Sequence, residues 1–233
     1  MPGYLVLFDI DGTILLTSGA GRRAITTALA EEVGAHEAFE RVRFDGKTDP
    51  QIVFELLEAT GHDRAGDRDF VELLCRRYVG LLAEELARPR STITLMPGIA
   101  ALLDRLEAEA GVVLGLLTGN VAEGAALKLA AGGIAPERFL VGAYGSDSAH
   151  RPDLPAIAAR RAWTIFGREP RGREVVIIGD TPADVECGRG IAARAIAVAT
   201  GGYSLEDLAS VGAHATFADL SDTERVLEAI LGD

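Results

Sequence analysis

The sequence has few cysteines and no long apolar run, and both absences narrow the possible classes of protein. Its two cysteines, Cys75 and Cys187, stand apart without a CxxC spacing or a nearby histidine. We expect reduced, partly buried thiols and neither a disulfide framework nor a cysteine-based metal site. No stretch approaches the roughly 18–20 apolar residues that cross a bilayer. The first residues lack the charged region of a signal peptide, so we expect a cytoplasmic protein.

Basic residues are also scarce. Lysine and arginine number 23 against 35 aspartates and glutamates, which gives a net charge of −12. Nucleic acids and anionic membranes are held mainly by clustered basic side chains, so neither is an expected partner. The 233 residues, 48% of them hydrophobic, are enough for one large core or for a core with a smaller insert. The oligomeric state is left open.

Continuous apolar segments bounded by turn residues recur along the chain and predict strands that are buried on both faces. They span residues 4–8, 112–117, 139–141, 175–178 and 195–198. Helical patterns separate them, at residues 98–109, 121–131, 154–166 and 182–190. Strands that alternate with helices predict an α/β fold with a doubly wound, Rossmann-like parallel sheet. Trp163 falls on an apolar helical face and is expected in the core.

The segment from residue 18 to residue 92 differs from the rest because it carries helical patterns only. These patterns span residues 20–33, 49–59 and 70–86. We therefore predict an all-helical domain, residues 18–92, inserted after the first strand of an α/β core made of residues 1–17 and 93–233. In such open sheets, ligands bind at the carboxyl ends of the strands.

Two aspartates follow the first predicted strand. Asp9 and Asp11 stand two residues apart, a spacing that points both carboxylates the same way on an extended chain. A turn would need only one such residue. Charges just past an apolar run are costly unless they are paired or bound to metal, so the pair indicates a cation or a reaction.

Another acidic pair follows the fourth predicted strand. Asp180 ends that strand, and Thr181 with Pro182 begins a helix in which Asp184 lies one turn later. Asp184 could simply favour the helix dipole. Together with Asp9 and Asp11, however, these carboxylates supply the oxygen ligands that Mg²⁺ prefers.

A third polar group, Thr118-Gly119-Asn120, follows the second core strand. A threonine hydroxyl and the amides of a glycine turn that opens a helix can bind an anion, although the same residues could be an ordinary helix cap. The position at the carboxyl end of a strand favours the anion site.

These three groups, in this order, resemble the motifs of the haloacid dehalogenase-like hydrolase superfamily, and its phosphoglycolate-phosphatase-like branch in particular. The quoted motifs are Asp9-Ile10-Asp11-Gly12-Thr13, Leu117-Thr118-Gly119-Asn120 and Gly179-Asp180-Thr181-Pro182-Ala183-Asp184. The helical insert resembles the mobile cap of that superfamily. The resemblance therefore implies a phosphatase that acts on a small phosphorylated metabolite.

The resemblance also implies a role for each site residue. Asp9 would be the nucleophile that forms an aspartyl-phosphate, and Asp11 the acid and then the base. Mg²⁺ would lie between Asp9, the Asp11 backbone carbonyl and Asp180, with Asp184 shaping the surroundings. Thr118 and the amides of Gly119 and Asn120 would hold phosphoryl oxygens.

Two basic residues complete the expected site. Members of the superfamily usually carry a lysine before a proline where this chain has Arg151-Pro152. Arginine keeps the charge and can bind phosphate in a bidentate manner, so Arg151 is expected to replace that lysine. Lys47 lies in a loop of the insert and could reach the substrate when the cap closes, or it could be a solvated surface lysine. Nearby, Thr48 or Asp49 is expected to cap the helix that begins at Pro50, a role that would account for Asp49.

Other functions remain possible, both among enzymes that use this kind of core and among proteins that are not enzymes. A dehalogenase is disfavoured because halide departure needs neither the Asp11 proton donor nor Mg²⁺. A sugar phosphomutase could use the same core and would accumulate a bisphosphate. A non-catalytic phosphate-binding regulatory protein would be favoured only by the change from lysine to Arg151. A phosphorylated receiver domain would not need the insert or the Thr118 motif.

Overall fold

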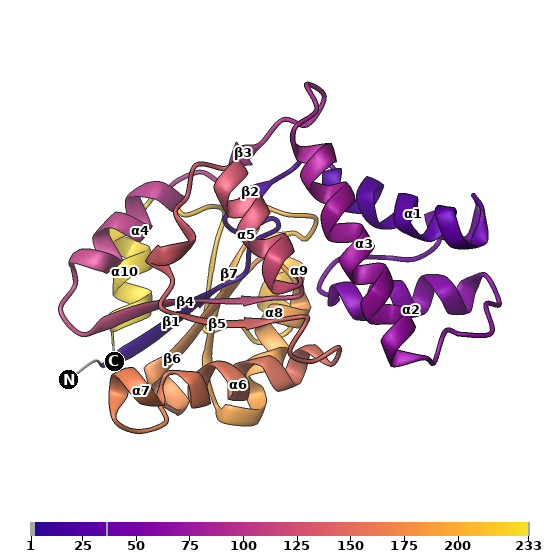
Figure 1. Cartoon of the computed structure of the whole chain (residues 1–233). Coiled ribbons are helices and arrows are strands. Elements are labelled where there is room, and N and C mark those ends of the chain that lie inside the picture. The colour runs from indigo at the N-terminus through magenta and orange to yellow at the C-terminus, as the bar shows by residue number, and fades with distance from the viewer. Residues whose placement is uncertain (1–2, 36, 233) are drawn as a thin grey trace.

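The computed structural model describes residues 3–35 and 37–232 and contains a six-stranded parallel sheet in the order β5-β4-β1-β6-β7-β8. The strands are β1 (Tyr4–Phe8), β4 (Val112–Thr118), β5 (Val141–Tyr144), β6 (Val175–Gly179), β7 (Arg194–Val198) and β8 (Ala215–Phe217). The chain first builds one side of β1 and then the other, as Figure 1 shows. The predicted doubly wound α/β fold is confirmed.

Helices cover both faces of this sheet. One face packs against α4 (Ile99–Ala108), α5 (Ala122–Ala131) and α10 (Thr223–Leu231). The other packs against α6 (Leu154–Arg161), α7 (Trp163–Phe166), α8 (Pro182–Cys187) and α9 (Leu205–Ser210). Short 3₁₀ turns lie at Glu37–Glu40, Pro136–Arg138, Arg151–Asp153, Gly172–Glu174 and Gly188–Ile191.

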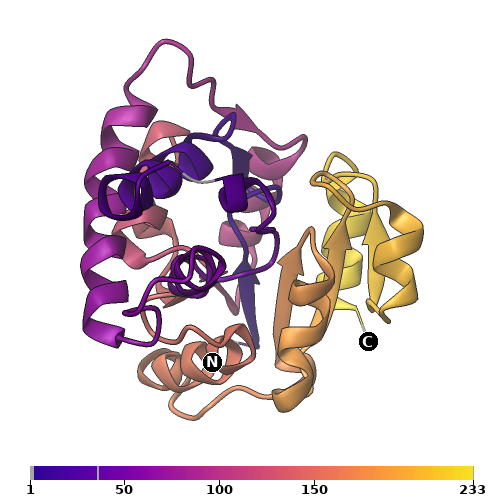
Figure 2. The ribbon, with the colours of Figure 1, turned by 90° about the vertical axis from the view of Figure 1, so that its right-hand side faces the viewer.

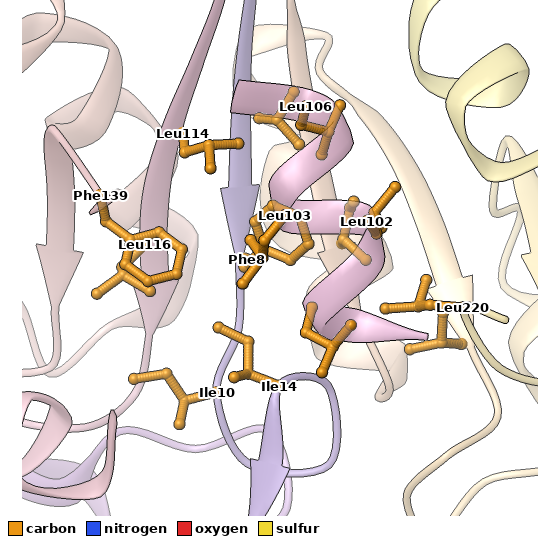
Figure 3. Packing of buried hydrophobic residues seen from close by; sticks show 14 of the residues in the cluster. Phe8, Ile10, Ile14, Leu102, Leu103, Leu106, Leu114, Leu116, Phe139 and Leu220 are labelled. Atoms are coloured by element: carbon orange, nitrogen blue, oxygen red, sulfur yellow. The ribbon is translucent and has the colours of Figure 1, made fainter. Parts of the chain in front are cut away.

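Strand β1 explains why the apolar segments run without interruption. Val6 and Phe8 join the cluster beneath α4, whereas Leu5 and Leu7 point to the opposite face and join the cluster beneath α6. Figure 3 shows Phe8 beside Leu103 of α4. Because side chains alternate along a strand, a strand covered on both sides needs an apolar residue at every position.

A second group of helices forms the helical insert, which we define as Ala20 to Leu86. It contains α1 (Ala20–Val33), α2 (Asp49–Ala59) and α3 (Arg68–Leu86), which share an apolar cluster of their own. The chain enters and leaves it through two short antiparallel strands, β2 (Leu15–Leu16) and β3 (Thr94–Leu95). The insert lies beside the sheet in Figure 1, and in Figure 2 the segments that follow β6 lie to one side of it.

Several boundaries differ from those predicted. The strand expected at residues 139–141 lies at Val141–Tyr144, and Phe139 packs into the core from the preceding loop. The pattern at 154–166 is divided between α6 and α7, and Trp163 is 56% exposed, so its predicted core position was wrong. Strand β8 was not predicted because its residues are only partly buried and do not form an apolar run.

Among the described residues, no helix combines the length and the apolar character that crossing a bilayer requires.

Candidate active site

The carboxyl ends of β1, β4 and β6 and the helical insert enclose a cleft of about 270 Å³. Most of the side chains singled out by the sequence motifs line it. They are Asp9, Asp11, Lys47, Thr118, Gly119, Asn120, Arg151 and Asp180. Asp184 does not line the cleft but lies behind it, in contact with Arg151. The fold therefore brings together residues from distant parts of the sequence.

The turn after β1 places the first acidic pair. The Asp9 backbone N–H donates to Ile178 of β6 at 2.9 Å, which extends the pairing of the strands by one residue. Ile10 points into the core, so Asp9 and Asp11 face the opposite way. Gly12 has φ +84°, and a Cβ there would lie 2.3 Å from an Asp180 oxygen. A glycine is required at this position on both counts.

Asp9, Asp180 and Asp184 form a buried acidic cluster. Each offers an oxygen, and these oxygens lie within 4.8 Å of one another. Burial raises the pKa of both Asp9 and Asp180, and the neighbouring Asp184 raises both further. A divalent cation at this point would favour the charged carboxylates and lower both pKa values. The set of hard oxygen donors therefore fits such an ion.

Arg151 is the positive charge within this cluster and is 4% exposed. Its Nη2 donates to Asp184 and lies 3.4 Å from Asp9 Oδ1. Its Nε has no hydrogen-bond acceptor among the described residues. The side chain also lines the cleft, so its guanidinium can bind a further oxygen there.

The segment after β4 closes the cleft from the side. The hydroxyl of Thr118 accepts from the Asn120 side-chain amide at 2.8 Å. The Gly119 N–H has no acceptor among the described residues, whereas the Val121 N–H donates to Asp49 of the insert at 2.8 Å. The carboxylate of Asp49 thus occupies the amide next to the expected anion pocket.

Asp49 therefore does not have the capping role that was expected for it. The cap of α2 is Thr48, whose hydroxyl accepts from the Gln51 N–H at 3.2 Å. Asp49 is 7% exposed, and burial raises its pKa to about 6 against the opposing effect of Lys128. A capping pattern cannot reveal this contact because its partner, Val121, lies in the other half of the cleft.

Lys128 is a site residue that the sequence analysis missed. Its Nζ donates to the Asp11 oxygens at 2.6 and 2.8 Å and to the Asn120 side-chain oxygen at 2.6 Å. Asn120 also donates to Asp11 at 2.8 Å. A signal was present, because Lys128 lies three and four residues after Ala125 and Gly124 on the buried face of α5. A lysine on the apolar face of a helix needs a buried anionic partner.

Lys47 lines the cleft at the end of an insert loop, where its ammonium forms an ion pair with Glu55 of α2. It is thus close to the site, as expected, but is engaged by a neighbour within the insert. The side chain of Lys47 is 25% exposed and that of Glu55 is 28% exposed.

Comparison with known proteins identifies the family of this chain. Residues 6–189 match the haloacid dehalogenase-like hydrolase family. Because the match spans most of the chain, the protein belongs to that family.

Two curated relatives and one solved structure extend this result. The chain is 34% identical over 220 residues to a phosphoglycolate phosphatase from Rhodospirillum rubrum, covering 93% of this chain and 87% of the relative. It is 28% identical over 233 residues to a phosphoglycolate phosphatase from Cereibacter sphaeroides, covering 99% and 100%. A hydrolase from Pseudomonas syringae has the same fold, with a TM-score of 0.71, 23% identity, and 98% and 99% of the two chains covered.

Proposed function

We propose that this hydrolase is a Mg²⁺-dependent phosphatase that cleaves a small phosphate monoester through an aspartyl-phosphate on Asp9. The observation that carries the proposal is the arrangement at the strand ends. A buried carboxylate cluster and the Arg151 guanidinium lie beside Asp11, which is held by Lys128. A phosphoryl group needs both an acceptor nucleophile and concentrated positive charge, and this cleft offers the two together.

Asp9 is the residue placed to attack phosphorus. One of its oxygens would form a bond to phosphorus while the bond from phosphorus to the leaving oxygen breaks. The guanidinium of Arg151 and the hydroxyl of Thr118, which both line the cleft, would bind the phosphoryl oxygens during this exchange. Both side chains are almost fully buried, so they are already oriented before the substrate arrives.

Asp11 is the residue placed to transfer protons. In the first step its carboxyl would give a proton to the leaving oxygen. In the second its carboxylate would take a proton from the water that attacks the aspartyl-phosphate, which releases phosphate and regenerates Asp9. The Asp11 side chain is 42% exposed toward the cleft, so it can reach both the leaving group and water.

The cation site fits Mg²⁺, and we propose Asp9, Asp180 and the Asp11 backbone carbonyl as its ligands, with Asp184 beside them. The bound ion would neutralise phosphoryl oxygens and reduce the repulsion between Asp9 and an anionic substrate. Thr13 donates to Asp180 at 3.2 Å and fixes the orientation of this carboxylate within the set.

Residues 18–92, which contain the helical insert, are proposed to be the cap domain. The insert touches the core at the cleft, where the Thr48 hydroxyl donates to the Ala149 carbonyl at 2.8 Å. The Asp49 N–H donates to the Gly119 carbonyl at 2.7 Å. Closing the cleft in this way would exclude bulk water and strengthen the electrostatic contacts inside it.

The substrate is proposed to be a small phosphorylated metabolite, with phosphoglycolate as the leading candidate. Both curated relatives are named phosphoglycolate phosphatases. The cleft volume of about 270 Å³ favours a substrate of a few carbons. A cytoplasmic enzyme without nucleic-acid or membrane partners remains our expectation.

Phosphate release from a panel of small monoesters tests this proposal. The protein would be assayed with Mg²⁺, with a chelator in its place, and with Mg²⁺ restored. We expect release only when Mg²⁺ is present, with phosphoglycolate among the best substrates. Turnover that is unaffected by the chelator would contradict the metal assignment. Accumulation of a sugar bisphosphate in place of free phosphate would favour a mutase.

A further inference from the structure

We propose that the wall of the cleft opposite the acidic cluster is a carboxylate subsite, made by Lys128, Tyr78 and the backbone of Gly21 and Arg22. It would bind a carboxylate carried by the leaving group of the substrate. The inference rests on the proposed phosphatase function and deepens it, because it assigns the residues that select the leaving group.

The first observation is the N-terminus of α1, a helix of 14 residues. Its cap residue, Gly19, provides no side-chain acceptor. The Ala20 N–H donates to Thr17, but the N–H groups of Gly21 and Arg22 have no acceptor among the described residues. Gly19, Gly21 and Arg22 all line the cleft. Free amides at the positive end of a helix favour an anion.

The second, independent observation is Tyr78 of α3. The residue is 1% exposed, it lines the same cleft, and its hydroxyl has no hydrogen-bond partner among the described residues. Burial and the nearby carboxylates of Asp49 and Asp11 raise the pKa of Tyr78, so the hydroxyl stays protonated as a donor. The hydroxyl lies at the cleft, where an oxygen of a bound ligand can accept its hydrogen bond.

These groups converge on one point. A Cβ built on Gly21 would lie 3.4 Å from Lys128 Nζ and 3.8 Å from the Tyr78 hydroxyl. The absence of a side chain at Gly21 therefore leaves a space bordered by an ammonium, a hydroxyl and backbone amides. All three kinds of group donate hydrogen bonds, which is the composition of a carboxylate site.

The position of Lys128 limits how far the carboxylate of the substrate can lie from the leaving oxygen. Its Nζ lies 2.6 and 2.8 Å from the two Asp11 oxygens. Asp11 would hydrogen-bond the leaving oxygen at about 2.7 Å, which places that oxygen within about 5.5 Å of the ammonium. A carboxylate one or two carbons from the leaving oxygen spans this gap.

Arg151 is assigned to the phosphoryl group, and among the other cations that line the cleft Lys128 has its ammonium at the space beside Gly21. The guanidinium of Arg22 donates to the carbonyls of Phe39 and Val42 and stacks on Phe44, and Lys47 is paired with Glu55. Lys128 would exchange one of its two Asp11 contacts for the substrate carboxylate. This exchange would free an Asp11 oxygen to face the leaving oxygen, so part of the selectivity would appear in kcat.

A matched pair of substrates tests the subsite in the complete enzyme with Mg²⁺. In 2-hydroxyethyl phosphate a hydroxymethyl group replaces the carboxylate of 2-phosphoglycolate. We expect wild type to favour phosphoglycolate in kcat/KM. Tyr78→Phe should reduce this preference by about 10- to 100-fold, the effect of one hydrogen bond to a charged group. Tyr4→Phe, which removes a hydroxyl at the other end of β1, should retain it.

Gly21→Ala provides a second variant, whose folding is not at risk because alanine favours a helix more than glycine does. Its methyl group would occupy the space between Lys128 and Tyr78, so the preference should fall while the unfolding temperature is kept or raised. Equal kcat/KM for the two esters in wild type, or unchanged preference in both variants, would overturn the subsite alone. No phosphate release from either ester would overturn the proposed function and, with it, the subsite.

Discussion

Arg151 has two kinds of contact in the site, and a residue-scale prediction follows from them. It neutralises buried Asp9 and Asp184, and it lines the cleft where the phosphoryl group is proposed to bind. Arg151→Ala should destabilise the fold by about 3–5 kcal/mol, because it leaves buried carboxylates without a counter-charge. Arg151→Lys keeps the charge and should recover most of that stability.

Arg151→Lys and Arg151→Ala should differ less in kcat and KM than in their free energies of unfolding. Lysine lacks the planar fork of arginine, so Arg151→Lys should still raise KM and lower kcat for phosphoglycolate. Urea unfolding and steady-state assays would measure the two effects separately. Wild-type kinetics in Arg151→Ala would remove this residue from the site.

Asp49 leads to a prediction about pH. Its pKa is raised from 3.8 to about 6 by burial, so the folded protein holds this proton more tightly than the unfolded chain does. The carboxylate therefore lowers stability progressively as the pH rises from about 4 to about 6, and the loss is complete above that window. In the Asp49→Asn variant, the side-chain amide oxygen can still accept from the Val121 N–H, and the side chain carries no charge.

Asp49→Asn should accordingly be more stable than wild type at pH 8, by on the order of 2 kcal/mol, and close to wild type near pH 4. Urea unfolding over this range measures the difference, and Asp45→Asn, in the exposed part of the same loop, is the control. A variant that is less stable than wild type at pH 8 would show that the Lys128 charge outweighs the burial of Asp49.

For single residues, the sequence predicted the positions of the acidic side chains better than the contacts that those side chains make. Asp9, Asp11 and Asp180 follow apolar strands, and strand ends meet at one edge of a sheet, so their proximity could be predicted from order alone. The contact between Lys128 and Asp11 could not, because it depends on the rotation of α5 against β1. The contact between Asp49 and Val121 depends in turn on where the insert docks.

At the scale of elements, the loop after β4 and the loop before α2 pack with no space between them. A Cβ on Gly119 would lie 2.0 Å from the Lys47 carbonyl oxygen, a backbone atom that cannot move alone. Gly119→Ala should therefore separate the two loops and weaken the contacts of Thr48 and Asp49 with the core. We expect at least a roughly tenfold lower kcat/KM together with a lower unfolding temperature.

Gly80→Ala is the matched control for that variant. Gly80 lies on the exposed face of α3, and nothing lies within 4 Å of the added methyl group. It should raise stability by about 1 kcal/mol through helix propensity and leave kcat/KM unchanged. If Gly119→Ala behaved like this control, the close docking of the two loops would not matter for turnover.

The elements that could be predicted are those with strong periodic patterns. Strands β1, β4 and β6 are buried on both faces and therefore read as continuous apolar runs. The three-residue edge strand β8 has no such pattern. Tertiary packing also overrides local pattern at Trp163, which lies on the outer surface of α7 despite its apolar neighbours.

At the scale of the whole molecule, one ion-pair network lies where the insert joins the core. Glu85 of α3 is 5% exposed and accepts from Arg23 at 2.8 Å and from Arg90 at 2.7 Å. Arg23 also donates to the Ser18 carbonyl at 2.6 Å and to the Ser91 hydroxyl at 3.1 Å. The network thus links the segments by which the chain enters and leaves the insert.

Glu85→Gln should loosen both connections, because it leaves clustered guanidinium groups without a counter-charge. We expect a loss of about 1–3 kcal/mol in unfolding free energy and faster proteolysis between residues 87 and 93. Glu84→Gln, on the exposed face of the same helix, serves as the control. Equal protease resistance in the two variants would argue against a role for the network in holding these segments.

The central claim for the whole molecule is that Asp9 is the nucleophile of a phosphatase. The most direct measurement is phosphate release from 2-phosphoglycolate in the presence of Mg²⁺, compared between wild type, Asp9→Asn and the exposed control Asp69→Asn. The account predicts activity in wild type and control and a loss of at least about a thousandfold in Asp9→Asn, with the variant still folded. Comparable release by Asp9→Asn, or none by wild type, would contradict it.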